Sequence, residues 1–83
     1  MPKVAEFSSK FLKNLNKLEV SKAKLIKSKI KDLLQDSTIG IPLQGNLKSL
    51  WKLRVGKIRI IYRFDNEKVY FVTLDYRKRV YKK

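Results

Sequence analysis

Cations recur at alternate positions in the segment WKLRVGKIRIIYRF, residues 51–64, on both sides of a Gly56-Lys57 step. Four of them follow this alternation: Lys52, Arg54, Arg59 and Arg63. No acidic residue occurs between Ser37 and Phe64. Lysine and arginine bind phosphate oxygens, and arginine does so with two parallel hydrogen bonds. The segment therefore predicts a surface that binds a phosphate-bearing ligand.

Gly56 and Lys57 predict a two-residue hairpin turn, because glycine in the first central position is typical of a type II′ turn. This turn sets Arg54 directly opposite Arg59. The other predicted pairs are Val55 with Ile58 and Lys52 with Ile61. Opposed side chains have Cβ atoms about 5 Å apart, so like charges there repel. The repulsion is about 1 kcal/mol in water and a few kcal/mol at an effective dielectric constant near 20. A bound phosphate would relieve it.

A row of cations on a strand is more often the wet face of a sheet, or protection of a sheet edge, than a binding site. Two features favour a binding site here. Ordinary surfaces mix both signs of charge, whereas this predicted face contains no carboxylate. The basic segment RKRVY, residues 77–81, is also able to fold back to the same region. We interpret the lysines of the predicted second helix as a solvated surface.

Aromatic side chains divide between the predicted core and the C-terminal segment. Those expected in the core are Trp51, Tyr62, Phe64 and Phe71. The places of Tyr70 and Tyr76 are less clear from the pattern. Tyr81 follows Arg77 by four residues in the most basic stretch of the chain, where a core position is hard to explain.

The hydrophobic pattern predicts which elements position these residues. Helical spacing marks two helices, in residues 8–18 with Ser8 or Ser9 as N-cap and in residues 22–36 with Ser21 as N-cap. Period-two patterns mark strands in residues 3–7, 50–55, 58–64 and 68–75. Residues 37–46 read as a loop and residues 76–83 as a short extended tail. The predicted order is β-α-α-β-β-β, an α+β fold with a helical hairpin on one face of an antiparallel sheet.

Composition limits the classes of function. The chain has 83 residues and a net charge of +14, which predicts one domain, residues 1–83, with a polyanionic partner such as nucleic acid, an anionic membrane or an acidic protein. It has no cysteine and no histidine, so we expect no disulfide, no metal site, no cofactor and no imidazole or thiolate chemistry. Neither a signal peptide nor a membrane span is apparent, which favours a cytoplasmic location and no membrane partner.

Three segments carry a resemblance to a known family. They are VAEFSSKFLKNLNKL, LQGNLKSLWKLRVGKIRIIYRF and DNEKVYFVTLDYRKRVYKK, which together cover nearly the whole chain. They resemble the RelE/ParE superfamily of toxins from toxin–antitoxin systems. The most specific parts are the WKLRVGKIRIIY hairpin and the C-terminal pattern R-x-x-V-Y.

The resemblance implies a ribosome-dependent endoribonuclease that cuts mRNA in the ribosomal A site by attack of a 2′-hydroxyl on the adjacent phosphate. By similarity, Lys52 and Arg54 lie beside the scissile phosphate and Arg59 stabilises its charge. Arg77 orients or protonates the leaving group, and Tyr81 accepts the 2′-hydroxyl proton or helps to position it. Further contacts to RNA and the ribosome are expected from Lys48, Lys57, Arg63, Lys78, Arg79 and Lys82.

One position departs from the family pattern. Many members have histidine before the arginine of the C-terminal motif, and here that position is Tyr76. The chain then resembles either a histidine-free branch or a member with weakened or lost catalysis. Because tyrosine has a pKa of about 10 and arginine is a very weak acid, we expect poor cleavage of free RNA.

Two other functions remain open at this point. ParE-like relatives inhibit DNA gyrase and do not cut RNA, and a basic module is also able to bind nucleic acid without catalysis. The resemblance further implies a small acidic antitoxin of the RelB type as partner, attracted by charge complementarity.

Overall fold

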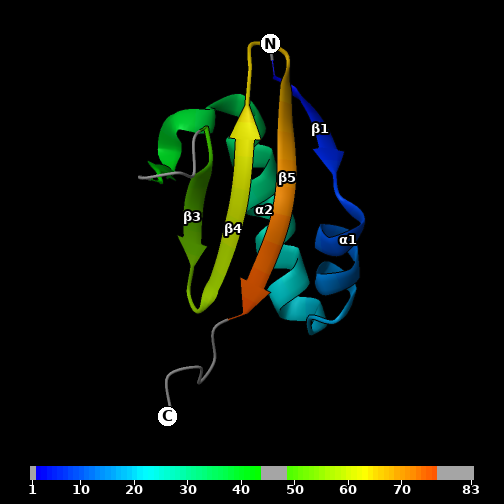
Figure 1. The fold of residues 1–83 in the computed structure, drawn as a ribbon. Coiled ribbons are helices and arrows are strands. Elements are labelled where there is room, and N and C mark those ends of the chain that lie inside the picture. Colours follow the sequence, from blue (N-terminus) through cyan, green and yellow to red (C-terminus); the bar gives the residue numbers. More distant parts are fainter. Residues whose placement is uncertain (1, 44–48, 77–83) are drawn as a thin grey trace.

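Two helices cover one face of a five-stranded sheet, and no described element covers the other face (Figure 1). The computed structural model describes residues 2–43 and 49–76. The elements are β1 (Val4–Phe7), α1 (Ser9–Asn16), α2 (Val20–Gln35), the 3-10 helix η1 (Ser37–Ile39), β2 (Ile41–Pro42), β3 (Trp51–Val55), β4 (Ile58–Phe64) and β5 (Lys68–Tyr76). The predicted α+β class and the helical hairpin on one face are confirmed. In the described residues no helix is long and apolar enough to cross a membrane.

The sheet is mixed, and the prediction of a purely antiparallel sheet was wrong at its first strand. The strand order is β1-β5-β4-β3-β2, and β1 pairs with β5 in parallel while the other pairs are antiparallel. The chain leaves β1, passes through the helical layer and re-enters the sheet at the opposite edge (Figure 1). No tight turn therefore fixes the direction of β1 against β5.

The segment predicted as a loop contains two short elements. Asp36 caps η1, its carboxylate accepting a hydrogen bond from the backbone N–H of Thr38 at 3.0 Å. The two residues of β2 then pair with β3 at the edge of the sheet. Pro42 is tolerated because an edge strand needs fewer backbone donors. A strand of two residues that includes proline has no period-two pattern, so the sequence did not reveal it.

The two helices begin differently, with a side-chain cap on α1 and none on α2. Of the two serines predicted as N-cap of α1, Ser8 holds the position, and its hydroxyl accepts a hydrogen bond from the N–H of Phe11 at 2.9 Å. The prediction of Ser21 as the second N-cap was wrong, because α2 begins at Val20 and Glu19 is its N-cap, without a side-chain cap. The short link between the helices leaves Ser21 inside the first turn of α2.

The core lies between the helices and the inner face of the sheet. The most deeply buried side chains are Phe11, Ile26, Leu33, Ile60, Tyr62, Val69 and Phe71. Trp51 and Phe64 are partly buried against them, so the predicted aromatic core is confirmed. Phe7, Phe11 and Phe71 form one aromatic group with ring centroids 5.1 to 5.4 Å apart, which joins β1 and α1 to β5.

A β-bulge in β5 separates the two halves of that strand. Tyr62 pairs with Phe71 and Ile61 pairs with Thr73, so Val72 is an extra residue on β5. Ser8 stabilises the bulge, because its hydroxyl donates to the Val72 carbonyl at 2.7 Å while its N–H donates to the Phe71 carbonyl. The bulge reverses the alternation of side chains, so Phe71 faces the core while Thr73 and Asp75 face outward.

Tyr62 anchors the connection from α2 to the edge of the sheet. Its side chain is fully buried, and its hydroxyl donates to the Ser37 carbonyl at 2.7 Å. Gly40 packs so closely here that a Cβ atom would collide with the Tyr62 hydroxyl and with the backbone carbonyl of Lys52. This packing fixes the backbone of β3 at Lys52, one of the predicted site residues.

We predict that Ser8→Ala lowers the free energy of unfolding by about 2 to 3 kcal/mol, because it removes a helix cap and leaves the Val72 carbonyl without its donor. Urea unfolding would measure the change. Ser9→Ala, one residue further along the chain, is the matched control and should change stability by less than about 0.5 kcal/mol. Equal losses in the two variants would contradict the role of Ser8 at the bulge.

Tyr62 also predicts alkaline sensitivity. Burial raises the pKa of Tyr62 to about 12, from about 10 in an unfolded chain. Its contribution to stability is complete below pH 10 and is lost as the pH rises through 12, because unfolding then releases a proton that the folded state retains. Tyr62→Phe removes this titration. The difference in unfolding free energy between wild type and variant should therefore shrink from pH 9 to pH 12, and a constant difference would contradict the assignment.

Candidate functional site

The hairpin predicted at Gly56-Lys57 is confirmed in its register. Val55 pairs with Ile58, Arg54 with Arg59 and Lys52 with Ile61. Gly56 has φ of +64°, a backbone conformation that glycine adopts without strain. Val55 and Ile58 are buried against the helices, so the alternate residues of β3 and β4 point to the uncovered side of the sheet.

We call this uncovered surface the cationic face and define it by Lys52, Arg54, Arg59 and Arg63. Arg54 and Arg59 stand directly opposite one another at the hairpin end. Lys57 lies in the turn beside them and is exposed. Within the described residues, Lys52 and Arg54 form no ion pair with a carboxylate. These two cations are therefore available to an anionic ligand.

Arg59 has a carboxylate partner, contrary to the expectation of a face without acidic residues. Asp75 on β5 is in register with Arg59, and its Oδ2 lies 3.3 Å from Nη2 of Arg59. The side chains are 28% and 42% exposed, so water screens the pair. The expectation failed because it considered only the hairpin. Asp75 belongs to the third strand and faces outward because of the bulge.

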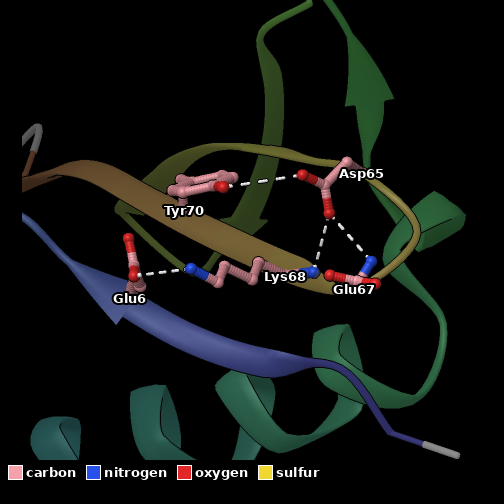
Figure 2. Close-up of polar contacts among 5 residues, drawn as sticks. All are labelled: Glu6, Asp65, Glu67, Lys68 and Tyr70. Atoms are coloured by element: carbon pink, nitrogen blue, oxygen red, sulfur yellow. Dashed lines mark hydrogen bonds and ion pairs between the residues drawn. The ribbon is translucent and has the colours of Figure 1, made fainter.

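At the end of the uncovered face away from the Gly56-Lys57 turn, acidic groups are paired with a lysine and with backbone N–H groups (Figure 2). Lys68 Nζ lies 3.1 Å from Glu6 Oε2, and this contact raises the pKa of Lys68. Asp65 accepts hydrogen bonds from the backbone N–H groups of Glu67 and Lys68 at 2.8 Å each, which lower the pKa of Asp65. Charge is thus unevenly distributed, with the unpaired cations gathered near the hairpin turn.

Arg63 lies toward the neutralised end. Its guanidinium carbon is 4.6 Å from the centroid of the Tyr70 ring, directly across the strand pair. Tyr70 is therefore a surface residue, and its hydroxyl also reaches Asp65 at 3.5 Å. Four residues of strand separate Arg63 from Arg59, roughly 13 Å at 3.3 Å per residue. Arg63 therefore lies outside the Arg54–Arg59 group.

The remaining predicted site residues lie outside the described part of the chain. They are Lys48, Arg77, Lys78, Arg79, Tyr81 and Lys82. The last described residue, Tyr76, pairs with Ile58, immediately after the hairpin turn. The described part of β5 therefore ends next to β4 at the hairpin end of that strand.

The cations at the hairpin end of the sheet are suited to binding a phosphate. Two opposed guanidinium groups and a neighbouring ammonium group are able to hold a phosphate and stabilise added charge on its oxygens. Among residues 2–43 and 49–76 no three metal-ligating side chains lie together. Sequence reasoning missed Asp75 and Thr73 at this place, because only the bulge, which leaves no pattern of its own, turns them outward.

Solved structures share this fold. The toxin–antitoxin complex RelBE2 from Mycobacterium tuberculosis contains a chain with 26% identity and a TM-score of 0.84, with 93% of each chain covered. The isolated RelE toxin of E. coli has 22% identity and a TM-score of 0.79, covering 95% of this chain and 90% of that one. The archaeal RelE–RelB complex from Pyrococcus horikoshii has 19% identity and a TM-score of 0.78, covering 95% and 99%.

The family itself is identified from the sequence. No curated protein is significantly similar to the chain. The model of one family, described as the ParE toxin of the type II toxin–antitoxin system parDE, matches residues 5–81. This match covers nearly all of the chain and agrees with the fold. The chain therefore belongs to the ParE toxin family of type II toxin–antitoxin systems, within the RelE/ParE superfamily.

Proposed function

We propose that this toxin is a ribosome-dependent endoribonuclease that cuts mRNA in the A site and so stops translation in the cytoplasm. The observation that carries the proposal is the opposed Arg54–Arg59 pair on an uncovered sheet face, with Lys52 beside it. A protein that only binds another protein has no evident need for two arginines set against each other. A phosphate that gains charge during reaction uses both.

The proposed reaction needs no co-reactant. The 2′-oxygen of a nucleotide forms a bond to the adjacent phosphorus, and the bond from that phosphorus to the 5′-oxygen of the next nucleotide breaks. The products are a 2′,3′-cyclic phosphate and a free 5′-hydroxyl. A base removes the proton from the 2′-hydroxyl, and an acid delivers a proton to the 5′-oxygen.

The roles follow from the chemistry of each side chain. Lys52 and Arg54 hold the scissile phosphate, and Arg59 stabilises the charge that develops on it. In this proposal Tyr81 accepts or guides the 2′-hydroxyl proton, and Arg77 assists the leaving group. Lys48, Lys57, Arg63, Lys78, Arg79 and Lys82 bind RNA and ribosome in this proposal.

Without histidine, proton transfer is poorly matched to neutral pH, because tyrosine holds its proton too tightly and arginine is a very weak acid. We therefore assign much of the substrate positioning to the ribosome. Cleavage of free RNA should be far slower than cleavage on translating ribosomes.

The proposed protein partner is an acidic antitoxin. The M. tuberculosis and P. horikoshii relatives were solved as complexes with antitoxins, the latter with RelB. A net charge of +14 on 83 residues favours a partner of opposite charge and fast association. We propose that the whole chain acts as one toxin domain toward this partner.

A second candidate function is inhibition of DNA gyrase. It is favoured by the match to the ParE family model, because ParE-like toxins act on gyrase. The two candidates differ in what they need from the cationic face. Cleavage requires Arg59 at a reacting phosphate, whereas a gyrase inhibitor needs this face only for general attraction.

The nuclease proposal predicts new mRNA 5′ ends at the A-site codon when the protein is added to an in vitro translation reaction. Arg59→Ala should reduce these cuts by roughly 100-fold or more, since it removes a donor to the charged transition state. Tyr81→Phe should reduce them by about 10²- to 10⁴-fold if its hydroxyl moves the proton. Mapping of 5′ ends measures both.

The matched control for these variants is Lys27→Ala, an exposed residue of α2. It should leave the cuts unchanged. Cleavage of free RNA at the same rate as ribosomal mRNA would refute ribosome dependence. An absence of cuts with normal translation would refute the nuclease proposal, and a gyrase supercoiling assay would then test the second candidate.

A further prediction concerns Asp75, whose charge opposes any phosphate bound at Arg59. Asp75→Asn should tighten binding of an uncleavable 2′-O-methyl RNA by roughly three- to tenfold, as expected from removing one charge about 6 Å from a phosphate near the surface. Fluorescence anisotropy would measure the Kd. At about 0.1 M salt, exposed charges are screened beyond about 10 Å, so only nearby charges affect the result.

Asp32→Asn is the control because it makes the same change in net charge on α2, where Asp32 contacts Lys29 at 3.9 Å. Its effect on the Kd should be less than about twofold, because the charge is remote from the cationic face. Equal tightening in both variants would mean that only net charge matters.

A further inference from the structure

Two side-chain polar atoms in the described part of the chain are buried without a hydrogen-bond partner, Nε of Arg59 and Oγ1 of Thr73. They belong to neighbouring positions. Arg59 is in register with Asp75, and Ile61 with Thr73, so Thr73 lies diagonally across from Arg59 on the outer surface of the sheet. Diagonal neighbours on one face are within reach of long side chains.

Such atoms are rare in folded proteins, because leaving a buried donor or acceptor unpaired costs about 1 to 3 kcal/mol. Elsewhere in the described structure the buried hydroxyls are used. Ser37 donates to the Leu33 carbonyl at 2.8 Å, and Tyr62 donates to Ser37. Both orphaned atoms instead lie on the uncovered face, since Arg59 is opposite Arg54 and Thr73 pairs with Ile61, the residue after Ile60 on the same strand as Arg59.

The chemistry of the two atoms matches a single ligand class. Arg59 Nε–H is a donor only, and the Thr73 hydroxyl is able to donate as well. Two donors at diagonal positions of a cationic surface suit an oxygen that carries negative charge. Asp75 does not fill this role, because its contact is with Nη2 of Arg59 and leaves Nε unpaired.

We propose that Thr73 is a further substrate-binding residue of this toxin, and that its hydroxyl and Arg59 Nε together bind a non-bridging oxygen of the RNA phosphate. The inference rests on the proposed function and adds a contact to it. Both atoms are shielded in the free protein, so the phosphate binds as Arg59 shifts from Asp75. That ion pair is half-exposed and weak, so a phosphate replaces it readily.

A purely structural role for Thr73 makes the opposite prediction for stability. If the hydroxyl served only the fold, its removal would cost free energy. Because the hydroxyl has no partner in the free protein, Thr73→Val keeps the shape of the side chain and removes an unsatisfied group. The variant should therefore be as stable as the wild type or more stable.

The test measures binding of a 2′-O-methyl RNA of about ten nucleotides by fluorescence anisotropy, together with urea unfolding of each protein. Thr73→Val should weaken binding about fivefold, the value that corresponds to one hydrogen bond of about 1 kcal/mol. Thr73→Ser keeps the hydroxyl and should bind within about twofold of the wild type. Thr38→Val is the matched control, because the Thr38 hydroxyl bonds only to Asp36 at the start of η1.

Each outcome separates the inference from the function it extends. Unchanged RNA binding by Thr73→Val, or weaker binding accompanied by lost stability, overturns the role of Thr73 even if wild type cuts mRNA. Weaker binding at full stability supports it even if no cutting is found, and then reassigns the contact to a non-catalytic phosphate site. A wild type that does not bind the free RNA overturns the inference, whereas the proposed function is judged separately by the mapping of mRNA 5′ ends on translating ribosomes.

Discussion

The contact between Ser8 and the bulge at Val72 fixes the geometry of everything on the outer surface of β5. One hydroxyl accepts a hydrogen bond from the first turn of α1 and donates to the carbonyl of the extra strand residue. Through this hydroxyl, α1 influences which side chains of β5 point into the core and which point outward. Val69 and Phe71, before the bulge, point into the core, and after it Leu74 does so while Thr73 and Asp75 lie on the outer surface. The position of Asp75 against Arg59 is thus set from the opposite side of the sheet.

Charge on the uncovered face is ordered along the strands. At one end the acidic side chains of Glu6 and Asp65 are satisfied by a lysine, backbone N–H groups and a tyrosine. At the other end Arg54 faces Arg59 with one carboxylate between β4 and β5. On the uncovered face, the cations without a carboxylate partner, Lys52 and Arg54, therefore lie toward the hairpin end, away from the ion pair of Lys68 with Glu6. Such a gradient orients a polyanion as it approaches.

The sequence was sufficient where structure is determined over a short range. The hairpin register followed from a glycine at a turn and from period-two alternation, and the Ser8 cap followed from residue type at a helix start. It was insufficient where distant segments meet. The parallel pairing of β1 depends on a route through the helical layer, and β2 is too short to show a pattern.

The residues of the candidate site divide in the same way, into those that a short-range pattern predicts and those that depend on contacts between distant segments. Lys52, Arg54 and Arg59 were found by alternation alone, since each lies on the hairpin that places it. Asp75 and Thr73 were missed because alternation from Val69 and Phe71 directs them into the core, and a single inserted residue reverses that assignment. A bulge leaves no signature in residue types, and only the hydrogen bond from Ser8 reveals why it is stable.

The distance between the opposed arginines, Arg54 and Arg59, bears on how a phosphate ligand is able to bind. Cross-strand neighbours on one face stand about 5 Å apart at Cβ, which is closer than successive phosphates along an extended RNA strand. Because arginine side chains are long, two guanidinium groups at this Cβ spacing are able to reach the same phosphate. A sheet holds the Cβ distance without the entropy cost of ordering a loop. Under the proposed function, recognition by this pair rests on the phosphate and not on the identity of the bases.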